Sequence, residues 1–131
     1  PLWVTPPDAS LMNYPNQWVA GQEYDFGNGL YGKRITGTIT ATANTQNNVN
    51  IVPAGVTGIV SSGGSIGFGD SGATGQTSLG QYSVSSAGST AIASDVRRLD
   101  ATGALNLVSS SASARTGNAN SQYDVWVKYT K

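Results

Sequence analysis

The chain has no cysteine and no histidine, and only 11% of its 131 residues are charged. Without cysteine it can form no disulfide, thiolate nucleophile or cysteine-ligated zinc site, so packing or association must stabilise it. Without histidine it lacks the commonest general base and metal ligand near neutral pH. These absences remove the usual machinery of most hydrolases, and we expect no enzyme activity, no cofactor and no metal.

Charge of either sign is equally scarce. Seven acidic and seven basic residues give a net charge of zero, which offers no electrostatic reason to expect nucleic acid or anionic lipid as a partner. No apolar run approaches the roughly 20 residues of a membrane helix, and no basic segment followed by an apolar one resembles a signal peptide. We therefore expect neither a nucleic-acid nor a membrane partner. The sequence begins at Pro1 rather than Met, and we expect a domain taken from a longer protein.

Glycine, serine, threonine and asparagine are abundant, and all four lose free energy in helix interiors. About eight short apolar segments, with turn signals roughly every 8–12 residues, predict an all-β antiparallel sandwich or jelly roll. Residues 1–20 hold four of the five prolines together with Trp3, Tyr14 and Trp18. They predict an arm or lead-in whose aromatic rings pack on the body of the domain or on a neighbouring subunit, followed by a sandwich domain over residues 21–131.

Alternation of apolar and polar residues places the strands. Tyr24 and Phe26 alternate with acidic residues, Asn28-Gly29 is a tight-turn signal, and a long strand follows to about residue 41. Further strands are expected at 49–52, from 56 to 61, on both sides of a turn at 87–88, at 95–99 and 104–109, and at 123–129. The stretch 62–80 has little apolar pattern and predicts a long loop, with at most a short strand at 65–69.

Residues 65–75, "SIGFGDSGATG", contain two motifs that resemble catalytic ones. Gly67 to Gly72 fits the G-x-G-x-x-G of dinucleotide-binding turns, but the following residues show no helical period that could place a helix N-terminus at a phosphate. Ser71 sits in a trypsin-like G-D-S-G context, yet no histidine exists to take its proton. A Gly-rich connection or trimer-axis loop, with Asp70 capping a turn, is the favoured interpretation.

Glu23 and Asp25 are the one carboxylate pair that suggests catalysis. They lie two apart on an expected strand, so they share a face at roughly 6–7 Å, between the separations typical of retaining and inverting glycosidases. The alternative is the polar face of an amphipathic strand whose other face carries Tyr24 and Phe26. We favour the second interpretation and keep glycan depolymerase as a lesser hypothesis.

The two ends of the chain resemble a known family. "GLYGKRIT" at 29–36, after a variable strand, is similar to an opening motif of phage tail head domains, and "VWVKYTK" at 125–131 is similar to their terminal strand. The resemblance is to the C-terminal head of receptor-binding or tail-tip proteins of phages that infect Gram-positive bacteria. It implies a homotrimer of β-sandwich heads on the virion, outside the cell, next to other tail proteins and in contact with a host cell-wall saccharide.

The resemblance implies a saccharide site, since aromatic rings stack on sugars while polar side chains bond the hydroxyls. The aromatic candidates are Trp126, Trp18, Tyr31, Tyr82 and Trp3, and the polar candidates are Asp25, Arg34, Asp70 and Arg115. Each aromatic could instead pack in the core or a subunit interface. A purely structural domain that caps or decorates a virion fibre as a trimer is the alternative function.

Overall fold

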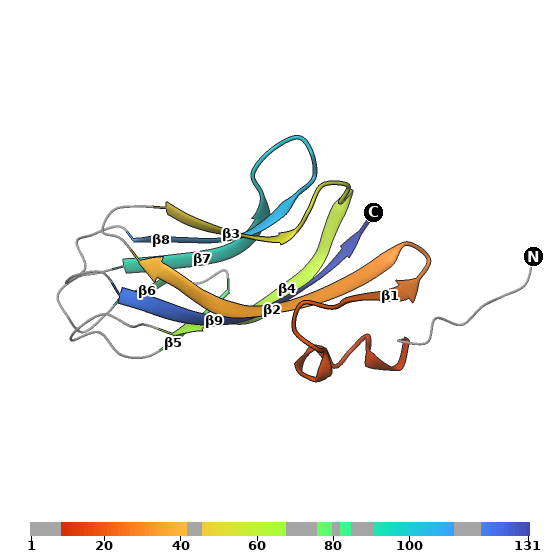
Figure 1. Ribbon diagram of the computed structural model, residues 1–131, viewed down its shortest axis with the longest axis horizontal. Helices are drawn as coiled ribbons and strands as arrows, with labels where there is room; N and C mark the ends of the chain where they lie inside the picture. The colour runs from red at the N-terminus through yellow and green to blue at the C-terminus, as the bar shows by residue number, and fades with distance from the viewer. Residues whose placement is uncertain (1–8, 42–45, 68–75, 80–81, 85–90, 112–118) are drawn as a thin grey trace, which may run out of the picture.

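The computed structural model describes residues 9–41, 46–67, 76–79, 82–84, 91–111 and 119–131 (Figure 1). Within these ranges the chain forms antiparallel strands and two single-turn 3-10 helices, and no α-helix. The 3-10 helices are η1 (Ala9–Leu11) and η2 (Pro15–Gln17). The strands are β1 (Glu23–Gly27), β2 (Leu30–Ala41), β3 (Gln46–Val52), β4 (Gly58–Gly67), β5 (Gln76–Ser78), β6 (Tyr82–Val84), β7 (Ala91–Arg98), β8 (Leu105–Ser111) and β9 (Ala119–Thr130).

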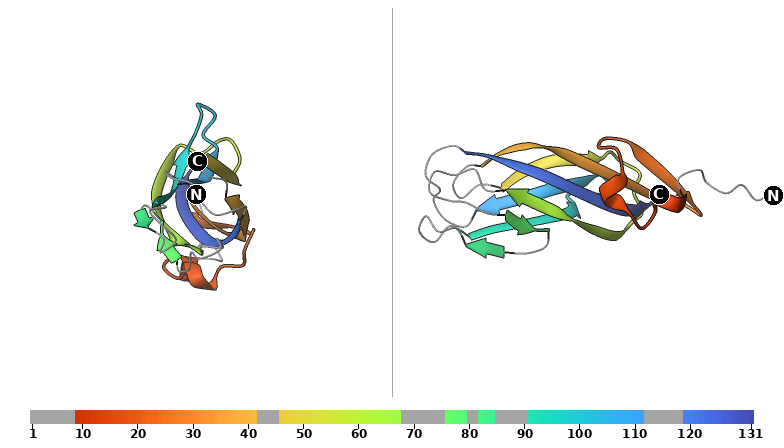
Figure 2. Two further views of the ribbon diagram at one scale, coloured as in Figure 1. Left: turned by 90° about the vertical axis from the view of Figure 1, so that its left-hand side faces the viewer. Right: turned by 90° about the horizontal axis from the view of Figure 1, so that it is seen from below.

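The strands form two stacked sheets. One has the order β1-β2-β9-β4-β5 and the other β3-β8-β7-β6. β5 and β6 have three residues each, so the sandwich rests on the seven longer strands, four in one sheet and three in the other. Figures 1 and 2 show the two layers lying face to face. The prediction of an all-β antiparallel sandwich is confirmed.

The last strand, β9, is central to the larger sheet because it pairs with β2 on one side and with β4 on the other. Its alternate side chains Tyr123, Val125, Val127 and Tyr129 face the second sheet and are at most 8% exposed. They meet Ile51, Leu105 and Leu107 in the core, as the period of two predicted. Full burial of such a side chain stabilises the fold by about 1.5–3 kcal/mol.

The β1–β2 hairpin also forms where the sequence predicts it. Asn28, with φ of 57°, and Gly29, with φ of 78°, both adopt the positive φ that a tight hairpin turn needs. In β1 the side chains of Tyr24 and Phe26 are buried and those of Glu23 and Asp25 are exposed. The hairpin therefore presents two aromatic rings to one face of the larger sheet.

A second apolar cluster covers that face, on the side away from the smaller sheet. Trp18 is 1% exposed and packs against Tyr24 and Phe26. Its ring lies over Gly32, where an added Cβ would come within 2.6 Å of it. Residues 9–18 thus fold over the outside of the five-stranded sheet (Figure 2). The prediction that these aromatic rings pack on the domain or on a neighbouring subunit is confirmed for Trp18. Tyr14 is 54% exposed on this chain, and Trp3 falls outside the described residues.

The prediction of a long loop over 62–80 is wrong for residues 62–64, which belong to β4, and for 76–78, which form β5. The short strand allowed at 65–69 is present over 65–67, at the end of β4. The Gly- and Ser-rich β4 has few apolar side chains of its own because β9 supplies them. Gly63 lies under the Trp126 ring, and Gly64 lies against the β9 backbone at Val125. Residues 68–75, which hold the G-D-S-G motif and all but Gly67 of the G-x-G-x-x-G motif, fall outside the described residues.

No helix in the described ranges has the length and apolar character needed to cross a membrane.

Candidate functional site

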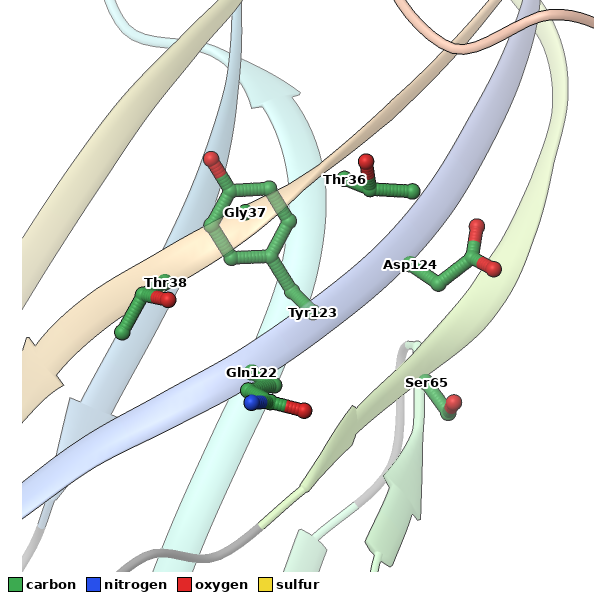
Figure 3. A pocket seen from close by; sticks show the side chains of 7 residues that line it. All are labelled: Thr36, Gly37, Thr38, Ser65, Gln122, Tyr123 and Asp124. Carbon is green, nitrogen blue, oxygen red and sulfur yellow. The ribbon is translucent and has the colours of Figure 1, made fainter.

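Two adjoining hollows form a groove on the outer face of the five-stranded sheet. The first has a volume of about 390 Å³ and is lined by Thr36 and Thr38 of β2, Ser65 of β4, and Gln122, Tyr123 and Asp124 of β9 (Figure 3). The second, of about 320 Å³, is lined by Pro15, Asn16, Arg34, Gly64, Ser65, Asp124 and Trp126. Ser65 and Asp124 line both hollows, so the two lie side by side. We call this surface the outer groove.

Strand pairing brings the groove residues together. Arg34 of β2 lies opposite Trp126 of β9, and Gly63 of β4 lies opposite Trp126 on its other side. Thr36 and Ser65 flank Asp124 in the same way. Since alternate residues of a strand share a face, Asp124 and Trp126 point to the outside while Tyr123 and Val125 point into the core.

An ion pair occupies the centre of the outer groove. Arg34 donates from Nε to Oδ1 of Asp124 at 2.8 Å and from Nη2 to Oδ2 at 2.6 Å, a bidentate arrangement. Its Nη1 donates to the carbonyl oxygens of Asn16 and Trp18, both at 3.1 Å. Arg34 therefore ties residues 16–18 to the sheet, and the wall formed by Pro15 and Asn16 depends on it.

Each member of the pair stabilises the charge of the other. The hydrogen bonds from Arg34 lower the pKa of Asp124 below its usual value, against an opposing effect of burial. The same hydrogen bonds raise the pKa of Arg34. Both groups therefore stay ionised around neutral pH, and the centre of the groove carries no net charge.

Trp126 forms one end of the outer groove. Its indole lies on Gly63, where a Cβ would come within 2.6 Å of the ring, and it meets Trp18 edge to face at 6.1 Å. The Lys128 Nζ lies 5.8 Å from the ring centroid. A cation–π contact at an exposed site contributes only about 0.5–1 kcal/mol, so a ligand ring can displace it. Trp126 is half-buried and held in place by its neighbours, as a stacking platform must be.

The structure brings two of the predicted saccharide residues together, Arg34 and Trp126. Trp18 was predicted as a stacking residue, but it is 1% exposed in a cluster with Tyr24 and Phe26, covered by Leu11 and Met12, and offers no face to a ligand. Tyr31 packs at 6.0 Å on Tyr129, on the opposite face of the sheet from Trp126, so the two cannot share a site. Asp25 accepts a hydrogen bond from the Gly27 amide within its own hairpin.

The remaining candidates lie elsewhere or cannot be placed. Tyr82 belongs to β6 of the smaller sheet, and its side chain is outside the described part of the chain. Asp70, Arg115 and Trp3 also lie outside the described residues. The residues that sequence reasoning missed are Asn16, Ser65, Gln122 and Asp124. For Asp124 a signal existed, since it lies two residues before Trp126 on the same strand face.

Glu23, the residue of the catalytic hypothesis, lies apart from the outer groove. Its carboxylate accepts hydrogen bonds from the Tyr129 hydroxyl and from the Lys131 ammonium, the latter at 2.9 and 3.1 Å. Although burial opposes ionisation, the bonds from Lys131 and Tyr129 lower the pKa of Glu23. Burial, with the nearby Glu23, raises the pKa of Tyr129. A glycosidase general acid needs a raised pKa, so this cluster has the electrostatics of a structural contact.

Because Glu23 is bonded to Tyr129 and Lys131 in the fold, we expect the protein to lose stability in acid. Because the folded-state pKa of Glu23 lies below 4.5, its contribution is complete above about pH 4.5 and is lost as the pH falls through the folded-state value. We expect Glu23→Gln to be less stable than wild type at pH 7 by roughly 0–1 kcal/mol and equally stable near pH 2. Thermal unfolding across that range measures it. Asp25→Asn is the matched control, and a difference that persists unchanged at pH 2 would contradict the assignment.

No cluster of three or more acidic side chains in the described part of the chain could hold a metal ion. Comparison with protein-family models, with curated proteins and with solved structures finds no match for this chain.

Proposed function

We propose that this chain is the non-catalytic, saccharide-binding head of a phage receptor-binding or tail-tip protein, and that the outer groove is its ligand site. In this proposal the domain works as a jelly-roll-like homotrimer on the virion, joined to other tail proteins, and attaches to host cell-wall saccharide. The observation that carries the proposal is the composition of the outer groove. The indole of Trp126, fixed by its neighbours, lies next to side chains with hydroxyl, amide and carboxylate groups.

The chemistry of the groove suits a sugar. Pyranose rings have an apolar face that stacks on an aromatic ring and an edge of hydroxyls that donate and accept hydrogen bonds. Trp126 supplies the ring, and Asp124, Asn16 and Ser65 supply the polar partners within one hollow. The groups are fixed on paired strands and by the Arg34 ion pair, so little ordering is needed when a ligand binds.

The resemblance of residues 29–36 and 125–131 to phage head domains gives independent support. Residues 30–36 of the first segment lie on β2 and residues 125–130 of the second lie on β9, the two strands that supply most of the groove. An open groove of this size makes few contacts, so each site is expected to bind weakly. Three heads in one trimer, and many trimers on a virion, would convert weak sites into firm adhesion through effective concentration.

Trp126→Ala tests the proposal. Removing the ring should lower the affinity for host cell-wall polysaccharide about ten-fold or more, equivalent to at least about 1.4 kcal/mol. Trp126→Phe, which retains an aromatic face, should keep most of the binding. Adsorption of the purified domain to susceptible cells and to their polysaccharide measures both, with circular dichroism as the check that each variant is folded. Unchanged binding by a folded Trp126→Ala protein would contradict the proposed site.

A structural cap is the second candidate, and an exposed apolar stretch favours it. Ile59 is 40% and Val60 is 57% exposed at the start of β4, where β5 does not pair with it. These side chains could contact another subunit. If Trp126→Ala changes the molar mass measured by light scattering and the wild type binds no glycan, the structural function replaces the adhesive one.

A further inference from the structure

The positive charge of Arg34 is already paired within the protein. A guanidinium has five N–H donors. Four of them are used by the two Asp124 oxygens and by the carbonyls of Asn16 and Trp18. A ligand that enters the groove therefore finds one remaining N–H and no free positive charge at this position.

Asp124 is the member of the pair that a ligand meets first. Its side chain is 48% exposed, whereas that of Arg34 is 24% exposed. Each carboxylate oxygen accepts one hydrogen bond from Arg34 and retains room for another. Since Asp124 lines both hollows, its free acceptor positions stand at the middle of the groove. Two adjacent acceptors suit the paired hydroxyl donors of a sugar ring.

The rest of the lining adds no charge that would favour an anion. Thr36, Thr38, Ser65 and Gln122 are neutral and both donate and accept hydrogen bonds (Figure 3). Lys128, whose Nζ lies 5.8 Å from the Trp126 ring centroid, lines neither hollow. Among the described residues that line the two hollows, Arg34 is the only cation, and it is already paired with Asp124. A phosphate or uronate there would face the Asp124 carboxylate without a free cation from this lining to compensate.

We propose that the outer groove selects uncharged sugars and discriminates against glycans that carry phosphate or carboxylate groups, with Asp124 as the residue that determines this selectivity. The inference rests on the proposed function of the groove. The hollow beside Trp126 takes one sugar unit by stacking. The hollow between Thr36 and Gln122 takes the next, since each volume is near the lower limit of small-molecule sites. An oligosaccharide therefore binds more tightly than a single sugar.

The test is a titration of the full chain with matched glycans, using calorimetry. The probes are uncharged oligosaccharides of glucose, galactose and N-acetylglucosamine, with counterparts that carry a uronate or a phosphate. Wild type should bind its best uncharged probe at least ten-fold more tightly than the charged counterpart. Asp124→Asn leaves Arg34 without a counter-charge, so it should bind the uncharged probe several-fold more weakly and the anionic one more tightly. Asp25→Asn removes the same charge outside the groove and should change neither affinity.

A second measurement does not depend on any variant. Binding of the uncharged probe by wild type should change less than two-fold between low salt and about 0.5 M salt, because no ion pair with the ligand forms. Tighter binding of the anionic probe by wild type, or affinity that falls steeply with salt, would overturn the selectivity while leaving a saccharide site in place. Failure of wild type to bind any probe or host polysaccharide would overturn the proposed function as well.

Discussion

Replacing Gly64 by alanine should destabilise the fold by more than about 4 kcal/mol, enough to leave much of the protein unfolded. Gly64 has φ of 115°, a conformation that L-residues rarely adopt. A Cβ built there would overlap the backbone oxygen of Asp124 and come within 2.6 Å of the Val125 Cα. These are backbone atoms at the centre of the five-stranded sheet, so no side-chain movement can relieve the contact. Chemical denaturation followed by circular dichroism measures the loss.

Gly55 provides a matched control for this prediction. Its φ of 111° is nearly the same, but a Cβ at Gly55 would meet nothing within 4 Å. Gly55→Ala should therefore cost only the backbone strain, about 1–3 kcal/mol. The difference between the two variants isolates the close approach of β4 to β9. Equal losses for Gly55→Ala and Gly64→Ala would show that this approach contributes nothing to stability.

The strand pairing at Gly64 also shows where sequence reasoning fails. The hairpin at Asn28-Gly29 and the last strand were predictable, because their own side chains alternate and their turn residues are specific. β4 has little such pattern around Gly63 and Gly64, since the apolar groups that cover it belong to β9. When the apolar side chains that pack on a strand belong to its neighbours, the sequence of that strand alone predicts a loop.

The candidate site was predictable to the same limited extent. Arg34 and Trp126 were chosen as residue types that bind sugars, and the structure places both in one hollow. Asp124 was missed because its importance comes from Arg34, a partner 90 residues away that only strand pairing brings close. Trp18 was assigned to the site although Leu11 and Met12 help to bury it, since no local pattern shows whether an aromatic ring is covered.

Trp18→Ala should cost about 3–5 kcal/mol, the range for removing a buried tryptophan or phenylalanine ring. Trp18 is 1% exposed and lies 5.4 Å from Phe26 and 6.1 Å from Trp126 between ring centroids. Its indole N–H donates to the Leu11 carbonyl at 2.7 Å. Losing these contacts should loosen residues 9–17 on the sheet, although Arg34 still bonds the carbonyls of residues 16 and 18. Denaturation measures the stability, and limited proteolysis followed by mass spectrometry shows whether cleavage within 9–17 becomes faster.

The same substitution connects the fold to the proposed function. Pro15 and Asn16 line the hollow beside Trp126, so loosening them disturbs one wall of the groove. Saccharide binding should therefore weaken in Trp18→Ala even at temperatures where the sandwich remains folded. Trp18→Phe keeps a ring over Gly32 but loses the bond to Leu11, and it should cost only about 1–2 kcal/mol and retain most of the binding. If Trp18→Ala resists proteolysis like wild type and binds equally well, the segment is held without Trp18. The outer groove would then not depend on the cluster of Trp18, Tyr24 and Phe26.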